Sequence, residues 1–241
     1  NLNSGKYFGI GNSLDEYHGE LNFYQDGGII INANGMKGIG IGSGLGGFIN
    51  IKRGHYEFDM KGQEGACIGS VNGDSELLIE YCDMDIYSGI SNGTIIGSVN
   101  GDADIKLENI SAKLQGAGNI ITGIGTIAGN SCMVRLENVN ISSNIRAKEC
   151  YGIGCRAGRT DIYIGYAAVK SVVQGKAAVA FGNSVMSAKL YCSNADIGTN
   201  AVTEFNSDIG ALEKNIQLEN GRAEFILNGQ EVKRQILAAR L

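Results

Sequence analysis

The chain repeats one short phrase, an apolar residue followed by glycine, about every 28 residues. The apolar residue is isoleucine in every copy except Phe181. The glycines are Gly11, Gly42, Gly69, Gly97, Gly125, Gly154, Gly182 and Gly210. Self-similarity at a fixed period of this length is typical of solenoids, in which each repeat stacks on the next. The pattern therefore predicts a stack of about eight coils.

Two further apolar columns keep the same period and lie two residues apart, which is typical of strands with one buried face. The first column is Leu21, Ile49, Leu77, Ile105, Val134, Ile162, Leu190 and Ile216. The second column is Phe23, Ile51, Ile79, Leu107, Leu136, Ile164, Cys192 and Leu218. Another alternating segment follows in most coils, as Met84 and Ile86 illustrate. About three short strands per coil predict an all-β fold, a single-stranded parallel β-helix, and the usual hand of parallel crossovers predicts right-handed coils.

We expect one β-helix domain over residues 1–241, with repeat coils over residues 6–228. The ends of a solenoid expose strand edges, which natural proteins cover. Val232, Ile236 and Ala239 share one face at helical spacing. Residues 229–241 are therefore predicted to form a short C-terminal cap helix, and a helix that docks on a further domain is the alternative.

Composition and charge restrict the classes of partner. The net charge is −5 and no long basic run occurs, which argues against binding of nucleic acid through this domain. No run of 18 apolar residues is present, so we expect no membrane insertion. The chain starts at Asn1 rather than methionine, from which we expect a processed product or a fragment of a larger protein. The oligomeric state stays open.

Six cysteines bear on the compartment. No two of them fall in the same column of the repeat, so stacking brings no pair together. We therefore expect reduced, mostly buried thiols that act as small apolar side chains. Reduced thiols favour a cytoplasmic location, with the cell surface or secretion as the alternative. The cysteines are Cys67, Cys82, Cys132, Cys150, Cys155 and Cys192.

The phrases Gly-Ile-Gly-Ser and Ile-Gly-Ser-Val-Asn-Gly-Asp, each followed by alternating apolar residues, carry a family resemblance. Over roughly residues 6–220 the chain resembles bacterial right-handed parallel β-helix repeat domains. Such domains occur in adhesin-like surface proteins of gut bacteria and as β-helical regions attached to regulatory proteins. The resemblance implies a glycine-rich bacterial repeat domain of the pectate-lyase-like superfold. That superfold also contains polysaccharide-active enzymes, and fold alone does not transfer function.

Few motifs for catalysis or cofactor binding are present. The only histidines are His18 and His55, and no C-x-x-C motif occurs, which nearly excludes zinc sites and Ser-His-Asp chemistry. The glycine phrases lack the lysine and hydroxyl residue of a phosphate-binding loop. We expect no cofactor, with calcium as a weak possibility, because the Asn-Gly-Asp corners have the wrong period for calcium-binding repeats.

Outward-facing columns supply the candidate binding residues. Coils three to five gather carboxylates around two cations, at Glu76, Glu80, Asp104, Lys106, Glu108, Arg135 and Glu137. Tyr163 and Tyr191 are neighbours in one outward column and could hold a sugar ring or a partner's side chain. The acidic and basic residues are interpreted as a surface ion-pair ladder, a polar binding strip, or a catalytic site in which carboxylates act as acid and base.

These observations lead to three hypotheses for function. The first is a non-enzymatic binding, interaction or sensor module of a larger bacterial protein, with a protein or carbohydrate ligand. Near-uniform coil lengths favour it, because enzymes on such folds usually insert long loops to form a cleft. The second is a polysaccharide-active lyase or hydrolase that uses Glu80, Lys106, Glu108 and Glu137. The third is a purely structural stalk or adhesin repeat.

Overall fold

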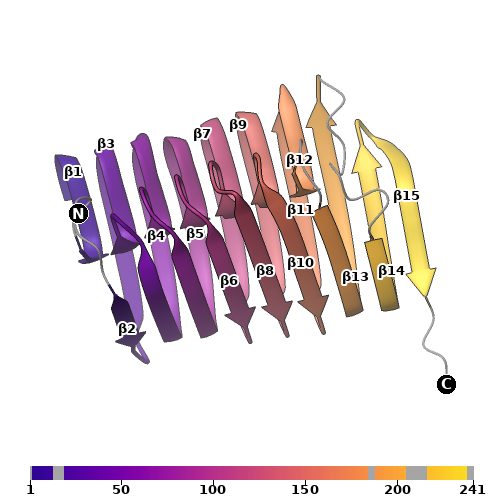
Figure 1. Cartoon of the computed structure of the whole chain (residues 1–241), viewed down its shortest axis with the longest axis horizontal. Coiled ribbons are helices and arrows are strands. Elements are labelled where there is room, and N and C mark those ends of the chain that lie inside the picture. The colour runs from indigo at the N-terminus through magenta and orange to yellow at the C-terminus, as the bar shows by residue number, and fades with distance from the viewer. Residues whose placement is uncertain (1, 13–18, 184–187, 205–215, 238–241) are drawn as a thin grey trace.

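The computed structural model describes residues 2–12, 19–183, 188–204 and 216–237. These residues form one 15-stranded sheet that winds into an all-β parallel solenoid of about seven turns (Figure 1). The predicted parallel β-solenoid is thus confirmed, while the eighth repeat glycine, Gly210, lies outside the described residues. The strands are β1 (Leu2–Gly11), β2 (Glu20–Tyr24), β3 (Gly28–Ser43), β4 (Gly47–Ser70), β5 (Ser75–Ser98), β6 (Ala103–Glu108), β7 (Ser111–Thr126), β8 (Ser131–Glu137), β9 (Asn140–Cys155), β10 (Arg159–Gly165), β11 (Ala168–Gly175), β12 (Ala177–Gly182), β13 (Ala188–Thr203), β14 (Ile216–Leu227) and β15 (Gln230–Leu237).

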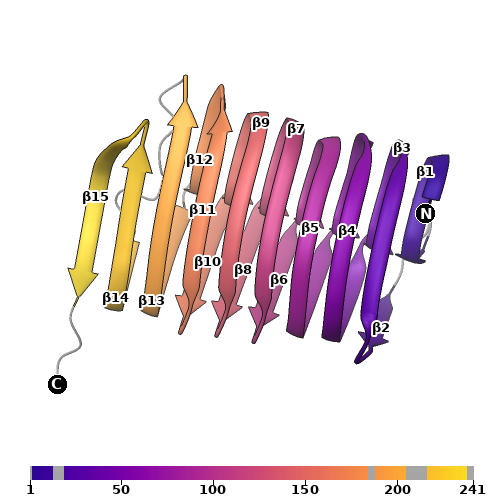
Figure 2. The same ribbon diagram turned by 180° about the vertical axis from the view of Figure 1, so that it is seen from behind.

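The coils stack in chain order, so β1 and β2 lie at one end of the solenoid and β14 and β15 at the other (Figure 1). One side of the stack, here called the A face, consists of β2, β6, β8, β10 and the first residues of β4, β5, β13 and β14. The view from behind shows the opposite side, with β3, β7, β9 and β11 nearest the viewer (Figure 2). Every candidate binding residue predicted from the sequence lies on the A face.

The predicted core columns pair residue by residue. Leu77 pairs with Ile105, and Ile105 pairs with Val134 on the next coil. From Ile49 to Leu190, the members of this column are at most 1% exposed. Full burial of an aliphatic side chain contributes about 1.5–3 kcal/mol relative to its exposed state. The continuous core therefore accounts for the regular repeat, and the register places the outward side chains of neighbouring coils side by side.

A left-handed backbone conformation marks the corner that follows the A face. One residue at this corner, here called the corner residue, has φ between 47° and 65° in each coil from that of β4 to that of β14. Asparagine is favoured there because it tolerates positive φ better than most residues. The corner residues are Arg53, Tyr81, Asn109, Asn138, Tyr166, Asn194 and Asn220.

The repeat glycines occupy a second corner and are required by both conformation and space. Gly97 has φ 136°, a value that side-chain-bearing residues rarely adopt. A Cβ atom on Gly97 would also collide with the carbonyl oxygen of Gly125, its partner on the next coil. The glycine column is therefore explained by packing of backbone on backbone.

The C-terminal cap helix predicted over residues 229–241 is wrong for the part that the structure describes. Residues Gln230–Leu237 form β15, which runs antiparallel to β14, and residues 238–241 lie outside the described residues. The chain reverses at Asn228 and Gly229, with φ 48° and 80°, as in a two-residue hairpin turn. Pairing with β14 satisfies edge backbone groups that a helix would leave open, and this outweighs the helical spacing of the apolar residues.

The cysteines are free and buried, as predicted. Burial raises the pKa of Cys67 to about 12 and that of Cys150 to about 11. A buried thiol that stays protonated behaves as a small apolar side chain and has little thiolate to react. The thiols therefore belong to the core and not to a reactive site.

Candidate functional site

The structure brings the predicted binding residues together on the A face in the expected columns. Lys106 pairs in register with Arg135, which is followed by Tyr163 and Tyr191 on the next two coils. The neighbouring column contains Glu80, Glu108 and Glu137. Glu76 pairs with Asp104 in the column on the other side. The repeat period therefore predicted the neighbours correctly.

Most of the charged residues form ion pairs within the chain. Lys106 Nζ lies 2.8 Å from Glu108 Oε2 on its own strand. Arg135 reaches back one coil to Asp104, with 2.5 Å between Nη1 and Oδ1, and also contacts the sulfur of Met133. The hydrogen bond to Glu108 raises the pKa of Lys106, which keeps its ammonium protonated. These four residues, Lys106, Glu108, Arg135 and Asp104, therefore form a surface ion-pair ladder. Individual pairs of this kind contribute little to stability.

Two carboxylates among the predicted binding residues are not neutralised by an ion pair. Glu76 and Glu137 form no ion pair with the described part of the chain. The Glu137 carboxylate lies over Gly165, where it occupies the space that a side chain at position 165 would fill. Glycine at position 165 thus lets Glu137 lean toward the next coil.

The tyrosines gather beside Glu137. The rings of Tyr163 and Tyr191 are 43% and 38% exposed, and their centroids are 6.4 Å apart at an interplanar angle of 47°. The Tyr191 hydroxyl donates a 2.8 Å hydrogen bond to Glu219, which raises the Tyr191 pKa. Tyr166, at the corner directly after β10, is 65% exposed. Tyr166 was not among the residues predicted from the sequence, where the visible signal was a tyrosine at a corner that carries asparagine in most coils.

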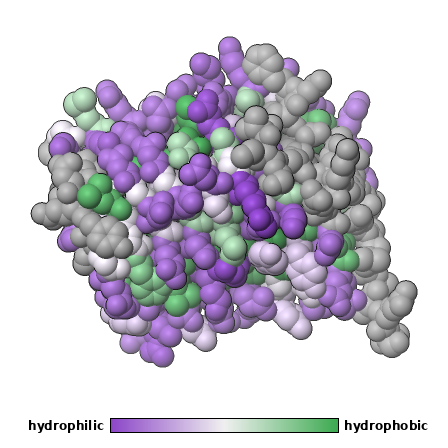
Figure 3. Space-filling view, viewed as in Figure 1, coloured by the Kyte–Doolittle hydropathy of each residue, from purple (hydrophilic) through white to green (hydrophobic). Residues whose placement is uncertain are grey.

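These side chains line an open depression of about 730 Å³ on the A face, here called the tyrosine depression. Its tyrosine end is lined by Glu137, Tyr163, Gly165, Tyr166, Tyr191 and Ser193. Its other end is formed by Lys106, Glu108, Met133 and Arg135. The surrounding surface is mostly hydrophilic, with small scattered hydrophobic patches (Figure 3). Aromatic rings beside fixed polar groups are the usual composition of a small-ligand or side-chain binding site.

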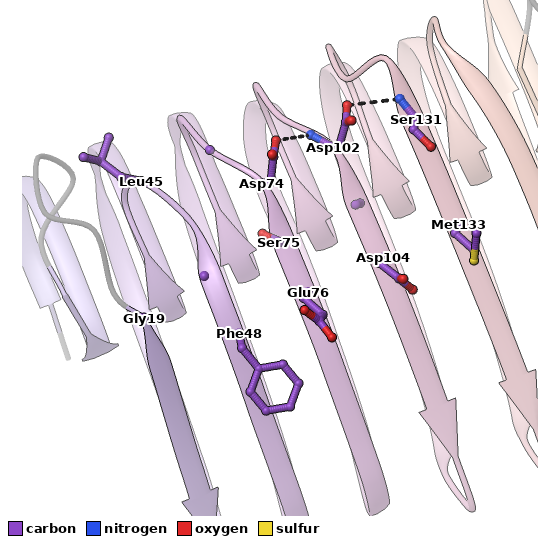
Figure 4. Close-up of a pocket in the computed structure, with 13 residues that line it drawn as sticks. Gly19, Leu45, Phe48, Asp74, Ser75, Glu76, Asp102, Asp104, Ser131 and Met133 are labelled. Atoms are coloured by element: carbon purple, nitrogen blue, oxygen red, sulfur yellow. Dashed lines mark hydrogen bonds between the residues drawn. The ribbon is translucent and has the colours of Figure 1, made fainter.

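A second depression, of about 620 Å³, lies near the corner that leads into β5 and β6 (Figure 4). Two of its acidic residues, Asp74 and Asp102, have structural partners. Asp74 Oδ1 accepts a 2.8 Å hydrogen bond from the backbone N–H of Asp102. Asp102 Oδ1 in turn accepts one of 3.0 Å from Ser131 (Figure 4). These carboxylates tie successive corners together, so this depression is a weaker candidate for ligand binding.

The described residues offer little for metal binding. No three histidine, cysteine, aspartate or glutamate side chains within the described ranges are close enough to hold a metal ion, so they give no support for calcium at the strip. Of the two histidines, His18 lies outside the described residues, and His55 contacts Glu57 at 3.0 Å on another side of the solenoid. In the described part of the chain there is no helix long and apolar enough to cross a membrane.

The tyrosine depression is thus the candidate site that combines several exposed aromatic rings with charged side chains. No protein-family model matches the chain, and no curated protein or solved structure matches it either. The chain is accordingly identified at the level of its fold, as a parallel β-solenoid.

Proposed function

We propose that this chain is a non-catalytic binding module whose ligand occupies the tyrosine depression. The observation that carries the proposal is Tyr166, a large aromatic residue held at φ 47° with 65% of its surface exposed. Bulky residues are uncommon in the left-handed region, and backbone strain of this kind clusters at functional sites. The coil imposes this φ on every corner residue, and an exposed ring contributes little to the core. The choice of a tyrosine instead of asparagine at this corner is therefore better explained by ligand contact than by folding.

The ion pairs of the A face support a non-catalytic role. A lyase would need a base that is deprotonated near neutral pH. Lys106 is a poor candidate because its hydrogen bond to Glu108 raises its pKa. Arg135 is engaged with Asp104 and stays protonated in any protein environment. Lys106 and Arg135 are therefore better suited to holding a ligand than to abstracting a proton from one.

The wider setting is part of the same proposal. The resemblance to bacterial β-helix repeats favours a domain of a larger bacterial protein, acting in sensing or interaction. The buried, unpaired thiols favour a reducing compartment such as the cytoplasm. A structural stalk remains the competing hypothesis, and it requires no ligand at the tyrosines.

The test is a binding screen of the full chain on a glycan array and a peptide array, with the double variant Tyr163→Ser and Tyr191→Ser beside the wild type. Tyr87→Ser is the matched control, because Tyr87 is 37% exposed outside the A face. We expect ligands that bind the wild type and the control but not the double variant, without turnover of any glycan. Ligands that still bind the double variant would contradict the proposed site. A wild type that binds nothing on either array would favour the stalk.

A further inference from the structure

Two corner residues of the solenoid are tyrosines, and comparing them suggests what the depression binds. Tyr81 and Tyr166 both have left-handed φ, 56° and 47°, and both are exposed, by 53% and 65%. The corners between them carry Asn109 and Asn138. The two tyrosines therefore occupy equivalent positions, three coils apart, and their surroundings can be compared residue by residue.

At Tyr81 the chain supplies its own cation. Lys52 Nζ lies 5.9 Å from the centroid of the Tyr81 ring and 3.1 Å from Glu80 Oε2. Lys52 comes from the preceding coil, where it pairs in register with Glu80. The ammonium thus lies between an aromatic face and a carboxylate, an arrangement that is favourable both as a cation–π contact and as a charge-assisted hydrogen bond.

At Tyr166 the same positions lack the cation. The register places Glu137 where Lys52 stands and Gly165 where Glu80 stands. The exposed ring and a carboxylate are both present, but no ammonium from residues 2–12, 19–183, 188–204 or 216–237 is found between them. Gly165 has no side chain, and the Glu137 carboxylate occupies the space that one would fill.

The other cations of the depression do not fill this position. Lys106 is held by Glu108, and Arg135 is held by Asp104 toward the opposite column. Glu219, which accepts the Tyr191 hydroxyl, adds a second carboxylate at the far side of the tyrosines. The tyrosine end of the depression is therefore aromatic and negatively charged.

We propose that the tyrosine end of the depression binds a lysine or arginine side chain of a partner protein, whose cationic group contacts the Tyr166 ring as Lys52 contacts Tyr81. This inference rests on the proposed binding function and specifies its ligand class. The positive charge of a basic side chain contacts the face of the Tyr166 ring, and its N–H groups donate hydrogen bonds to the Glu137 carboxylate. An acidic glycan would meet Glu137 and Glu219 as like charges, and the described residues supply no free cation at this end to compensate for them.

The test uses fluorescein-labelled peptides in which lysine or arginine alternates with glycine and serine, and a matched peptide with glutamine at the basic positions. Fluorescence anisotropy with the full chain should show binding of the basic peptides only, weakened by salt. Glu137→Gln and Tyr166→Asn should each reduce affinity about fivefold to tenfold. Glu57→Gln, which removes an exposed carboxylate from another side of the solenoid, should leave affinity unchanged.

A fourth variant, Glu137→Lys, places a lysine in the register position of Lys52, so that the chain supplies its own ammonium beside Tyr166. It should abolish binding of the basic peptides while the protein stays folded, as checked by circular dichroism. Equal binding of the glutamine peptide, or undiminished binding by Glu137→Lys, would overturn the inference.

The two proposals fail in different ways. If no basic peptide binds, but a glycan binds the wild type and is lost in the double variant of Tyr163 and Tyr191, the cation inference is wrong and the binding function stands. If neither peptide nor glycan binds the wild type, both are wrong.

Discussion

The side-chain amide of Asn138 donates a 2.6 Å hydrogen bond to Oδ1 of Asn109, the corner residue one coil earlier. Both residues have left-handed φ, 51° and 55°. Asparagine at this corner therefore meets two requirements, since it tolerates the backbone conformation and links its coil to the next.

Replacing Asn138 separates these two contributions. Glycine at position 138 adopts the left-handed φ without strain but cannot form the hydrogen bond. Asn138→Gly should therefore lower the free energy of unfolding by about 1 kcal/mol. Asn138→Ala also introduces backbone strain and should lower it by about 2 kcal/mol. Urea unfolding followed by circular dichroism measures both values. An alanine variant as stable as the glycine variant would show that the φ value is not limiting.

The glycine column should be the least tolerant part of the repeat. Alanine at position 97 would have to adopt a rare φ, and its Cβ would collide with the Gly125 carbonyl. We therefore expect Gly97→Ala to lower the free energy of unfolding by more than about 4 kcal/mol, or to fail to accumulate as soluble protein. Gly198→Ala in β13 is the control, because a Cβ there meets nothing within 4 Å. That variant should be neutral or more stable by about 0.5 kcal/mol. Similar thermal unfolding of the two variants would disprove the explanation.

Tyr166 should be replaceable with a gain in stability. Tyr166→Asn installs the residue that most other corners carry and loses little buried area, because the ring is exposed. We expect the free energy of unfolding to rise by about 0.5–1 kcal/mol. Tyr81→Asn should be about neutral, since loss of the Lys52 contact offsets the same relief. Urea unfolding of both variants tests this, and a destabilised Tyr166→Asn would assign the ring a structural role.

The buried thiols predict an alkaline limit to stability. Burial raises the pKa of Cys67 from 9.0 to about 12, and that of Cys192 likewise to about 12. Below about pH 9 both the folded and unfolded thiols are protonated, so this source of stability is complete there. Between about pH 9 and 12 only the unfolded thiols ionise, which favours unfolding by on the order of 1 kcal/mol per thiol per pH unit.

Urea unfolding under reducing conditions at about pH 8 and pH 10 measures the effect. The free energy of unfolding should be lower at the higher pH, and Cys67→Ala should show a smaller decrease than the wild type. The comparison uses the change with pH in each protein, so a general destabilisation by the substitution does not affect it. An unchanged pH dependence in Cys67→Ala would contradict the assignment.

The periodicity of the sequence was enough to predict the fold and the neighbours on the A face. Leu77 lies against Ile105, and Lys106 beside Arg135, because a parallel stack places residues of equal offset one strand apart. The ion-pair partners of the charged residues could not be predicted from their positions within the repeat alone. Lys106 pairs within its own strand while Arg135 reaches across to another coil, and such choices depend on side-chain rotamers.

The C-terminus shows where periodicity misled. Val232 and Ile236 have helical spacing, yet Gln230–Leu237 is a strand. A local signal for this was present, since Asn-Gly is the strongest short hairpin signal and occurs at residues 228–229. Tyr166 was missed for a related reason, because alternation describes strands and says nothing about the conformation of the corners between them.

The antiparallel direction of β15 has a consequence for assembly. An open solenoid end presents a parallel edge onto which the first coil of another molecule can add, and repetition of that step would build a filament. Over Gly221–Leu227 this edge is already paired with a strand of the opposite direction. Head-to-tail polymerisation in the register of the coils is therefore blocked along that segment by a reversal of strand polarity.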